Sequence, residues 1–220
     1  MAANGYRLVI GNKNTSSWSL RPWLAMKEAA IDFTEIRINL RAPDMKDQIL
    51  AHSRAGKVPV LGAGDIMIWD SLAILEFLAE QHPEKALWPS DTEARALARS
   101  VSAEMHSGFQ ALREHCPMKI LAEEPKDDLI DPVQVNIRRI VEIWSECRKR
   151  FGGSGPFLFS HFTIADAMYA PVASRFRTYV PDLAPFGDDG TAAAYIDAVF
   201  ALPGMAEWTD GARQETTSST

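Results

Sequence analysis

The chain of 220 residues has only two cysteines, Cys116 and Cys147, and neither belongs to a Cys-x-x-Cys pair or a histidine-rich cluster. We therefore expect no disulfide framework and no metal site, and a reducing compartment fits this cysteine content. The sequence has no apolar run of membrane-spanning length, and its first residues lack the apolar core of a signal peptide. These features predict a cytoplasmic protein.

The chain also lacks a basic surplus, because its formal net charge is −6. Binding to nucleic acid or to an anionic membrane surface needs a basic face, so neither partner is expected. A small anionic ligand stays possible, since the local field of a cleft can oppose the net charge. With 46% hydrophobic residues, the chain can bury a full core as one large domain or two small ones.

The first 82 residues alternate between strand-like and helix-like segments. Strands are predicted at 6–10, 33–38, 58–61 and 66–69, and helices at about 17–31, 44–51 and 71–78. The order is βαβ followed by ββα, which is the arrangement of a thioredoxin-like domain. This predicts an α/β N-terminal domain at residues 1–82.

The pattern becomes helical after a proline-containing linker at 83–91. Residues 92–213 predict an all-α domain, in which Leu97, Val101, Met105 and Leu112 mark one long helix. Residues 214–220 lack apolar side chains and are expected to be a disordered tail.

Two short segments of the first domain carry features of a ligand site. Val58-Pro59 stands at the entrance of a β-branched run, where proline is tolerated and where a cis bond makes a bend. Asp70-Ser71 precedes an apolar run with helical spacing, and the amides at the start of a helix attract anions. Together they suit a small acidic peptide, and we predict that Val58-Pro59 is cis.

These segments, together with Ser16-Ser17, resemble the glutathione-binding half of cytosolic glutathione S-transferases. The motifs are Lys-Val-Pro-Val-Leu at 57–61, Trp-Asp-Ser-Leu-Ala-Ile at 69–74, and the late Phe-Thr-Ile-Ala-Asp at 162–166. The resemblance is to the serine-type classes and nearest to the zeta class. It implies a glutathione S-transferase fold, glutathione as co-substrate and a homodimer. In the late motif, Thr163 and Asp166 form an N-capping box with a structural role, worth about 1 kcal/mol at Thr163.

The resemblance also implies which residues hold glutathione. The residue before the proline, Val58, pairs its backbone with the cysteinyl part, beside Pro59. Asp70 and Ser71 receive the γ-glutamyl end. Lys57 or His52 meets the glycyl carboxylate, although an exposed lysine is more often only solvated.

The resemblance implies that the thiol is activated by a hydroxyl in the segment Asn14-Thr15-Ser16-Ser17. Laid without gaps on the zeta-class motif, Asn14 falls at the serine that usually meets the thiol, so a small shift is needed for Ser16 to take this role. Thr15 and Ser17 remain alternatives, and Ser16 and Ser17 could equally be simple helix caps.

A single hydroxyl and a helix start can supply the required activation. A thiol has a pKa of about 8.5, and lowering it by about two units takes roughly 2.7 kcal/mol. A hydrogen bond to a charged group contributes about 1.5–3 kcal/mol, and a helix N-terminus up to about 2 kcal/mol.

Candidates for the second-substrate pocket are Trp18 and three residues at helical spacing, His106, Phe109 and Arg113. The alternative is that Phe109 packs in the core while the other two form a solvated edge. By resemblance to zeta-class enzymes, Arg175 holds a substrate carboxylate, although its neighbour Arg177 is equally charged.

The leading hypothesis is an enzyme that activates glutathione and adds it to a small electrophile. A second is zeta-like cis/trans isomerisation of a small diacid, of the maleylacetoacetate isomerase type, with glutathione as a recycled cofactor. A third is a non-catalytic glutathione-binding module, which Asn14 in the usual hydroxyl position would favour.

Overall fold

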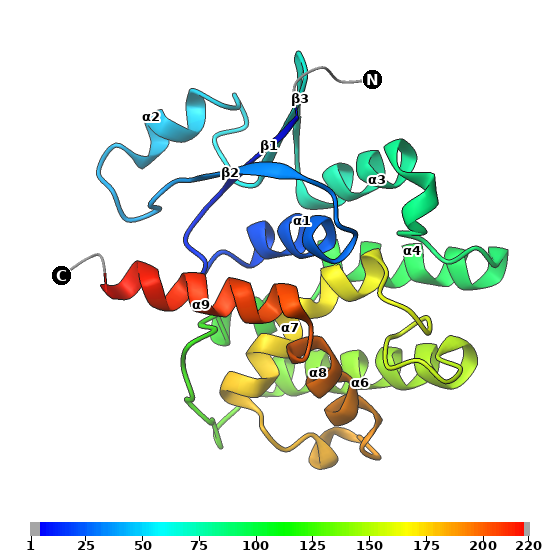
Figure 1. Ribbon diagram of the computed structural model, residues 1–220. Helices are drawn as coiled ribbons and strands as arrows, with labels where there is room; N and C mark the ends of the chain where they lie inside the picture. The colour runs from blue at the N-terminus through cyan, green and yellow to red at the C-terminus, as the bar shows by residue number, and fades with distance from the viewer. Residues whose placement is uncertain (1–4, 218–220) are drawn as a thin grey trace.

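The computed structural model describes residues 5–217 as two halves that share one hydrophobic core (Figure 1). The N-terminal half contains β1 (Tyr6–Ile10), α1 (Ser17–Glu28), β2 (Phe33–Arg37), α2 (Met45–Leu50), β3 (Val60–Ala63), β4 (Ile66–Trp69) and α3 (Ser71–Gln81). The C-terminal half contains α4 (Thr92–Ser107), α5 (Gln110–His115), α6 (Asp131–Phe151), α7 (Ile164–Tyr179), α8 (Thr191–Phe200) and α9 (Pro203–Thr217), with short 3-10 turns η1 (Pro83–Lys85) and η2 (Ala184–Phe186). The predicted βαβ and ββα order, followed by helices, is confirmed.

The sheet brings three distant segments to one edge. Its strand order is β2-β1-β3-β4, with β1 parallel to β2 and antiparallel to β3, which is in turn antiparallel to β4. Val9 pairs with Val60, and Val60 pairs with Trp69. The loop after β1, the residues before β3 and the residues after β4 therefore all emerge at the same edge.

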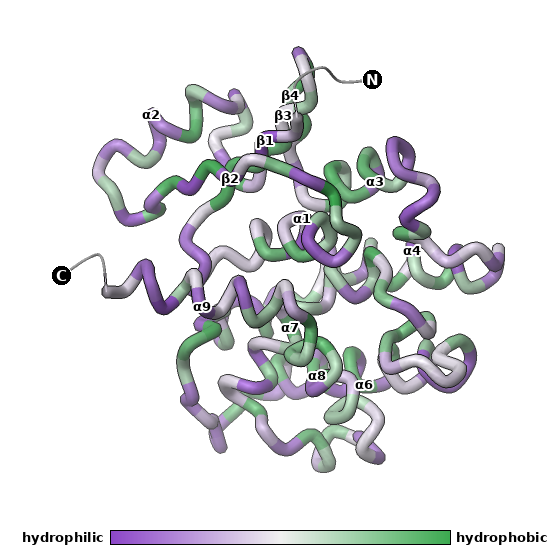
Figure 2. The backbone as a smooth tube through the Cα atoms, in the orientation of Figure 1, coloured by the Kyte–Doolittle hydropathy of each residue, from purple (hydrophilic) through white to green (hydrophobic). Residues whose placement is uncertain are grey.

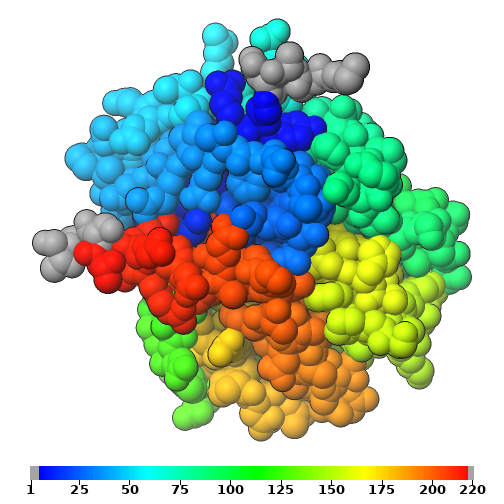
Figure 3. Space-filling view, viewed as in Figure 1, coloured from blue at the N-terminus to red at the C-terminus, as the bar shows by residue number. Residues whose placement is uncertain are grey.

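The two halves pack against each other through α1. Helix α1 contacts α3 on its own side and α7 and α9 of the C-terminal half, and Figure 1 shows it between the sheet and these helices. Trp23 of α1 packs edge-on against Trp208 of α9, with ring centroids 5.1 Å apart. Figure 3 shows α9 lying directly along the N-terminal half. In Figure 2, the C-terminal part of α9 is mostly hydrophilic.

The single long helix expected through Leu97 and Leu112 is wrong, because the chain breaks at Gly108-Phe109. Phe109 has a φ of 59°, and its ring is buried in the core. The carbonyls left without helical partners accept from the Arg113 guanidinium, which reaches back to Met105, His106 and Gly108. Helix α4 therefore ends at Ser107, and α5 begins at Gln110.

The disorder expected for 214–220 is wrong for residues 214–217, which form the last turn of α9. The side chain of Glu215 is held by contacts to the loop after β1, so polar contacts rather than apolar burial order this turn. Residues 218–220 lie outside the described residues.

Candidate functional site

A cavity of about 730 Å³ opens at the sheet edge where the three segments meet. The residues that line it are Thr15, Ser16, Ser17, Trp18, Leu40, Ile49, Ala55, Gly56, Lys57, Val58, Pro59, Trp69, Asp70 and Ser71. The segments that the sequence singled out thus form one site. Val58-Pro59 is cis, as predicted. Lys57 is exposed on the cavity wall, whereas His52 is half-buried outside the lining.

Ser16 occupies the N-cap position of α1 but does not cap it. Within residues 5–217, no backbone amide donates to its hydroxyl. Its Oγ instead lies 2.7 Å from the Oγ of Ser19, which accepts a hydrogen bond from the Gly11 amide at 3.1 Å. The Ser16 side chain is nearly buried at the cavity wall, which leaves one small opening toward a ligand.

The other candidates in this loop have different surroundings. Thr15 is exposed, and the Ser17 Oγ accepts from Nη2 of Arg175 at 3.4 Å. Asn14 lies outside the cavity lining, because its main-chain and side-chain oxygens accept from the amides of Ile120 and Leu121. Asn14 therefore fastens the loop to the C-terminal half.

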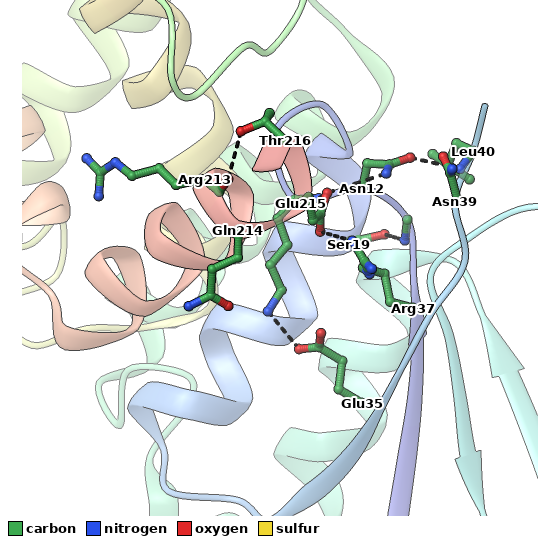
Figure 4. Close-up of polar contacts among 12 residues, drawn as sticks. Asn12, Ser19, Glu35, Arg37, Asn39, Leu40, Arg213, Gln214, Glu215 and Thr216 are labelled. Carbon is green, nitrogen blue, oxygen red and sulfur yellow. Dashed lines mark hydrogen bonds and ion pairs between the residues drawn. The ribbon is translucent and has the colours of Figure 1, made fainter. Parts of the chain in front are cut away.

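Helix α9 also holds the loop after β1 in place. The Glu215 carboxylate accepts from the Lys13 amide at 3.0 Å and from the Asn12 side chain at 3.4 Å, and it pairs with Arg37 at 3.2 Å. Figure 4 shows Glu215 at the end of α9, beside Asn12 and Arg37. The Trp208 indole donates to the Lys13 carbonyl at 2.7 Å. The hydroxyl-bearing loop is thus held by residues more than 190 positions away in sequence.

Asp70 has a constrained backbone at the start of α3. Its φ of 78° is costly for a residue with a Cβ, and such conformations gather at ligand sites. Oδ1 accepts from the amides of Leu72 and Ala73, at 2.9 and 3.3 Å, so the carboxylate caps α3. Oδ2 lies 3.2 Å from Nε2 of His106, which connects the two halves across the cavity entrance.

Ser71 is fully buried, and its Oγ accepts from Nη1 of Arg21 at 3.2 Å. Because an arginine can only donate, the Ser71 hydroxyl keeps its own proton for a further acceptor. Burial, together with the nearby charges of Arg113 and Arg175, lowers the pKa of Arg21 to about 9, and the Asp70 charge opposes this shift. Arg21 was not predicted from the sequence, because nothing in its spacing distinguishes a buried arginine from a surface one.

The candidates for a second-substrate pocket divide into cavity-lining and structural residues. Trp18 lines the cavity, with the His106 ring edge-on at 5.2 Å and the Arg113 guanidinium at 5.0 Å. Burial lowers the pKa of His106, although the Asp70 charge opposes this shift. Phe109 packs in the core, and Arg113 donates to main-chain carbonyls at the end of α4.

Arg175 lies behind the cavity wall. It is buried, and its Nε and Nη1 donate to the carbonyls of Cys116 and Pro171 at 2.9 and 3.1 Å, while Nη2 points to Ser17. Arg177 stacks over the Phe200 ring at 4.5 Å, away from the cavity. Of these two arginines, the one named by the resemblance is the one that reaches a cavity residue.

Across residues 5–217, no three His, Cys, Asp or Glu side chains gather closely enough to hold a metal ion. No helix in the described part of the chain has both the length and the apolar character needed to span a membrane.

Comparison with known proteins gives a consistent family. Residues 15–81 match the family model described as glutathione S-transferase, N-terminal domain. Glutathione S-transferase Z2 of Arabidopsis thaliana is 27% identical over 86% of this chain and 84% of its own length. A probable maleylacetoacetate isomerase of Caenorhabditis elegans and the maleylacetoacetate isomerase of Rattus norvegicus are each 33% identical, and the chain spans about half the length of these two relatives.

Solved structures agree on the fold. A glutathione transferase homologue from Burkholderia, crystallised with bound glutathione, superposes with a TM-score of 0.71 at 22% identity, covering 96% of this chain and all of that one. The order of elements, the cavity at the sheet edge and these similarities lead to one assignment. The chain has the glutathione S-transferase fold, and its residues 15–81 match the N-terminal domain of that family.

Proposed function

We propose that this protein binds glutathione in the cavity and activates its thiol for attack on a small electrophile. The observation that carries the proposal is the Ser16 hydroxyl, which stands at the start of α1 and at the cavity wall without serving as a helix cap. A hydroxyl and the unpaired amides of a first helical turn both stabilise a thiolate. The glutathione peptide would lie between Val58 and the Asp70-Ser71 turn, its cysteinyl part near the loop after β1.

A glutathione titration followed by thiolate absorbance tests binding and activation together. We expect binding in the micromolar to millimolar range, with a thiol pKa lowered by one to two units from about 8.5. Ser16→Ala should raise that pKa and slow turnover with a general electrophile by roughly ten- to a hundredfold, with little change in affinity. Thr15→Ala and Ser17→Ala are the matched controls. If all three variants keep wild-type activity, activation by a hydroxyl is wrong.

A second candidate function is isomerisation of a small unsaturated diacid. The supporting observation is a group of three neighbouring arginines: Arg21 and Arg113 lie 4.3 and 5.0 Å from the ring of the cavity residue Trp18, and Arg175 lies close enough to Arg21 to lower its pKa. Such a field attracts a carboxylate substrate. Turnover of maleylacetoacetate with catalytic glutathione would favour this activity, and consumption of glutathione would favour transfer. Binding without either reaction would favour the non-catalytic module.

We also propose a cytoplasmic homodimer. The edge strand β4 exposes Ile66 and Trp69, which remain 52% and 57% accessible and are large apolar side chains for a free surface. Cys116 and Cys147 are both free and buried, which suits a reducing compartment. Light scattering that gives a monomer at micromolar concentration would contradict the dimer.

A further inference from the structure

Ser19 is a buried hydroxyl one hydrogen bond away from the cavity. It is completely inaccessible, its Oγ lies 2.7 Å from the Ser16 Oγ, and it accepts from the Gly11 amide at 3.1 Å. Neither the sequence motifs nor the family resemblance assigns it a role. Its two contacts connect a main-chain amide at the end of β1 to the hydroxyl that faces the ligand.

The directions of these hydrogen bonds are limited by how many protons are present. The Gly11 amide can only donate, so the Ser19 oxygen is an acceptor there and keeps one proton of its own. Between the two hydroxyls, either oxygen can donate. When Ser16 donates to Ser19, lone pairs of Ser16 face the cavity. When Ser19 donates to Ser16, the Ser16 proton is free for a ligand.

An anion beside Ser16 selects the second arrangement. A thiolate repels the lone pairs of the Ser16 oxygen and attracts the proton of the Ser16 hydroxyl. If both hydroxyls rotate, Ser16 can donate to the thiolate while Ser19 donates to Ser16, so no hydrogen bond of the series is lost. The result is one directed series, from the Gly11 amide to Ser19, from Ser19 to Ser16 and from Ser16 to the sulfur. Each bond in such a series polarises the next and strengthens it.

The series of hydrogen bonds begins at the Gly11 amide, and its geometry depends on the absence of a side chain at this residue. A Cβ there would lie 2.5 Å from Cδ1 of Leu40 and 3.1 Å from the Ser16 Oγ. Glycine therefore lets the main chain, Leu40 and Ser16 come together. The amide is in turn held in place because β1 is a central strand of the sheet.

We infer that Ser19 is a positioning residue for thiol activation, which acts only through Ser16 by accepting from Gly11 and donating to the Ser16 oxygen. This inference rests on the proposed function. It predicts that removing the Ser19 hydroxyl raises the pKa of bound glutathione and that this effect disappears once Ser16 is absent.

The test is a double-mutant cycle on the thiol pKa of bound glutathione, read from difference absorbance. Ser19→Ala should raise this pKa by about half a unit, less than the one to two units expected for Ser16→Ala. Glutathione affinity should stay within about twofold, since Ser19 is one residue removed from the ligand. In the Ser16→Ala background, Ser19→Ala should add no further shift. An equal shift in both backgrounds, or no shift in either, overturns the inference.

Controls separate this inference from the proposed function. Ser100→Ala removes an exposed hydroxyl on α4 that donates to the Ala96 carbonyl, and it should leave the pKa unchanged. If Ser19→Ala does not fold, Ser19→Cys replaces the hydroxyl by a somewhat larger thiol that is only a weak donor, and it must also raise the pKa of bound glutathione. A wild-type protein that leaves the thiol pKa unchanged refutes the proposed function. A lowered pKa that responds to Ser16→Ala but not to either Ser19 variant refutes only the positioning role.

Discussion

At the start of α7, the hydroxyl residue Thr163 faces Asp166 in a closed set of hydrogen bonds, whereas at the start of α1 the hydroxyl residue Ser16 faces another hydroxyl and a cavity. Asp166 accepts from the Thr163 amide at 2.8 Å, from the Thr163 Oγ1 at 3.0 Å and from the Leu158 amide at 3.1 Å. Both Thr163 and Asp166 are fully buried. The predicted capping box is confirmed.

The difference shows how one fold separates stability from reactivity. A buried helix start whose donors and acceptors are all matched contributes to the stability of the fold and offers nothing to a ligand. A helix start with an uncommitted hydroxyl contributes less to stability but can bind an anion. The following predictions test this contrast, from the largest free-energy change to the smallest.

Asp166→Ala should lower the free energy of unfolding by about 3–5 kcal/mol, because three buried donors lose their acceptor together. Urea unfolding measures this change. The matched control is Asp91→Ala at the exposed start of α4, where the carboxylate accepts from the Ala94 amide and about 1 kcal/mol is expected. Equal losses at the two caps would remove the contrast between closed and ordinary caps.

The closed cap should also give stability an unusual pH dependence. Burial raises the pKa of Asp166 to about 6, against about 3.9 in an unfolded chain, although the hydrogen bonds from Leu158 and Thr163 oppose the shift. Between these values the folded protein binds a proton that the unfolded chain does not, so this group's contribution, up to about 3 kcal/mol, is lost as pH rises from 4 to 6.

Asp166→Asn cannot titrate, so the difference in unfolding free energy between wild type and this variant should decrease by that amount across the window. A difference that stays constant, or that increases, would mean that the three hydrogen bonds outweigh burial.

A third helix start, that of α3, also faces the cavity. Here Ser71→Ala should weaken glutathione binding by roughly tenfold or more, since a hydrogen bond to a carboxylate is worth about 1.5–3 kcal/mol. Asp70→Asn keeps an acceptor for the α3 amides and should weaken binding through the lost charge. Calorimetry measures both, with Ser107→Ala on the exposed face of α4 as control. Unchanged affinity in both variants would refute the γ-glutamyl site.

The smallest change is expected for Ser16→Ala in unfolding rather than in activity. Because the Ser16 hydroxyl receives no amide hydrogen bond from the described part of α1, its loss should change stability by about 0.5 kcal/mol or less. Thr163→Ala, the same kind of change at the closed cap, should cost about 1 kcal/mol or more. If Ser16→Ala destabilises the protein as much as Thr163→Ala, the start of α1 is an ordinary cap.

Local signals in the sequence were enough to predict the features set by short-range chemistry. The element order of the first half, the cis bond at Val58-Pro59 and the capping box all depend on neighbours within a few residues. The break before Phe109 was missed, although Gly108 is a typical residue at the end of a helix; the Arg113 side chain that donates to the freed carbonyls gives no comparable signal in the sequence.

The parts of the site that the sequence did not reveal come from long-range packing. Asn14 could be aligned with a catalytic position, but its oxygens accept from amides more than 100 residues away. Ser19 and Arg21 follow the recognised segment on α1, and their spacing is that of ordinary helix residues. Only their burial and their partners, Ser16 and Ser71, distinguish them.

The contact between Glu215 and the loop after β1 has a consequence for variation in this protein. Substitutions in the last turn of α9 would change the main-chain position of Lys13 and, through it, the neighbouring hydroxyls. A scan of single substitutions scored by turnover should therefore contain a sensitive position at Glu215, even though the cavity lining ends at Ser71. Natural or engineered diversity in the final helix would then tune reaction rate without touching the residues that bind the ligand.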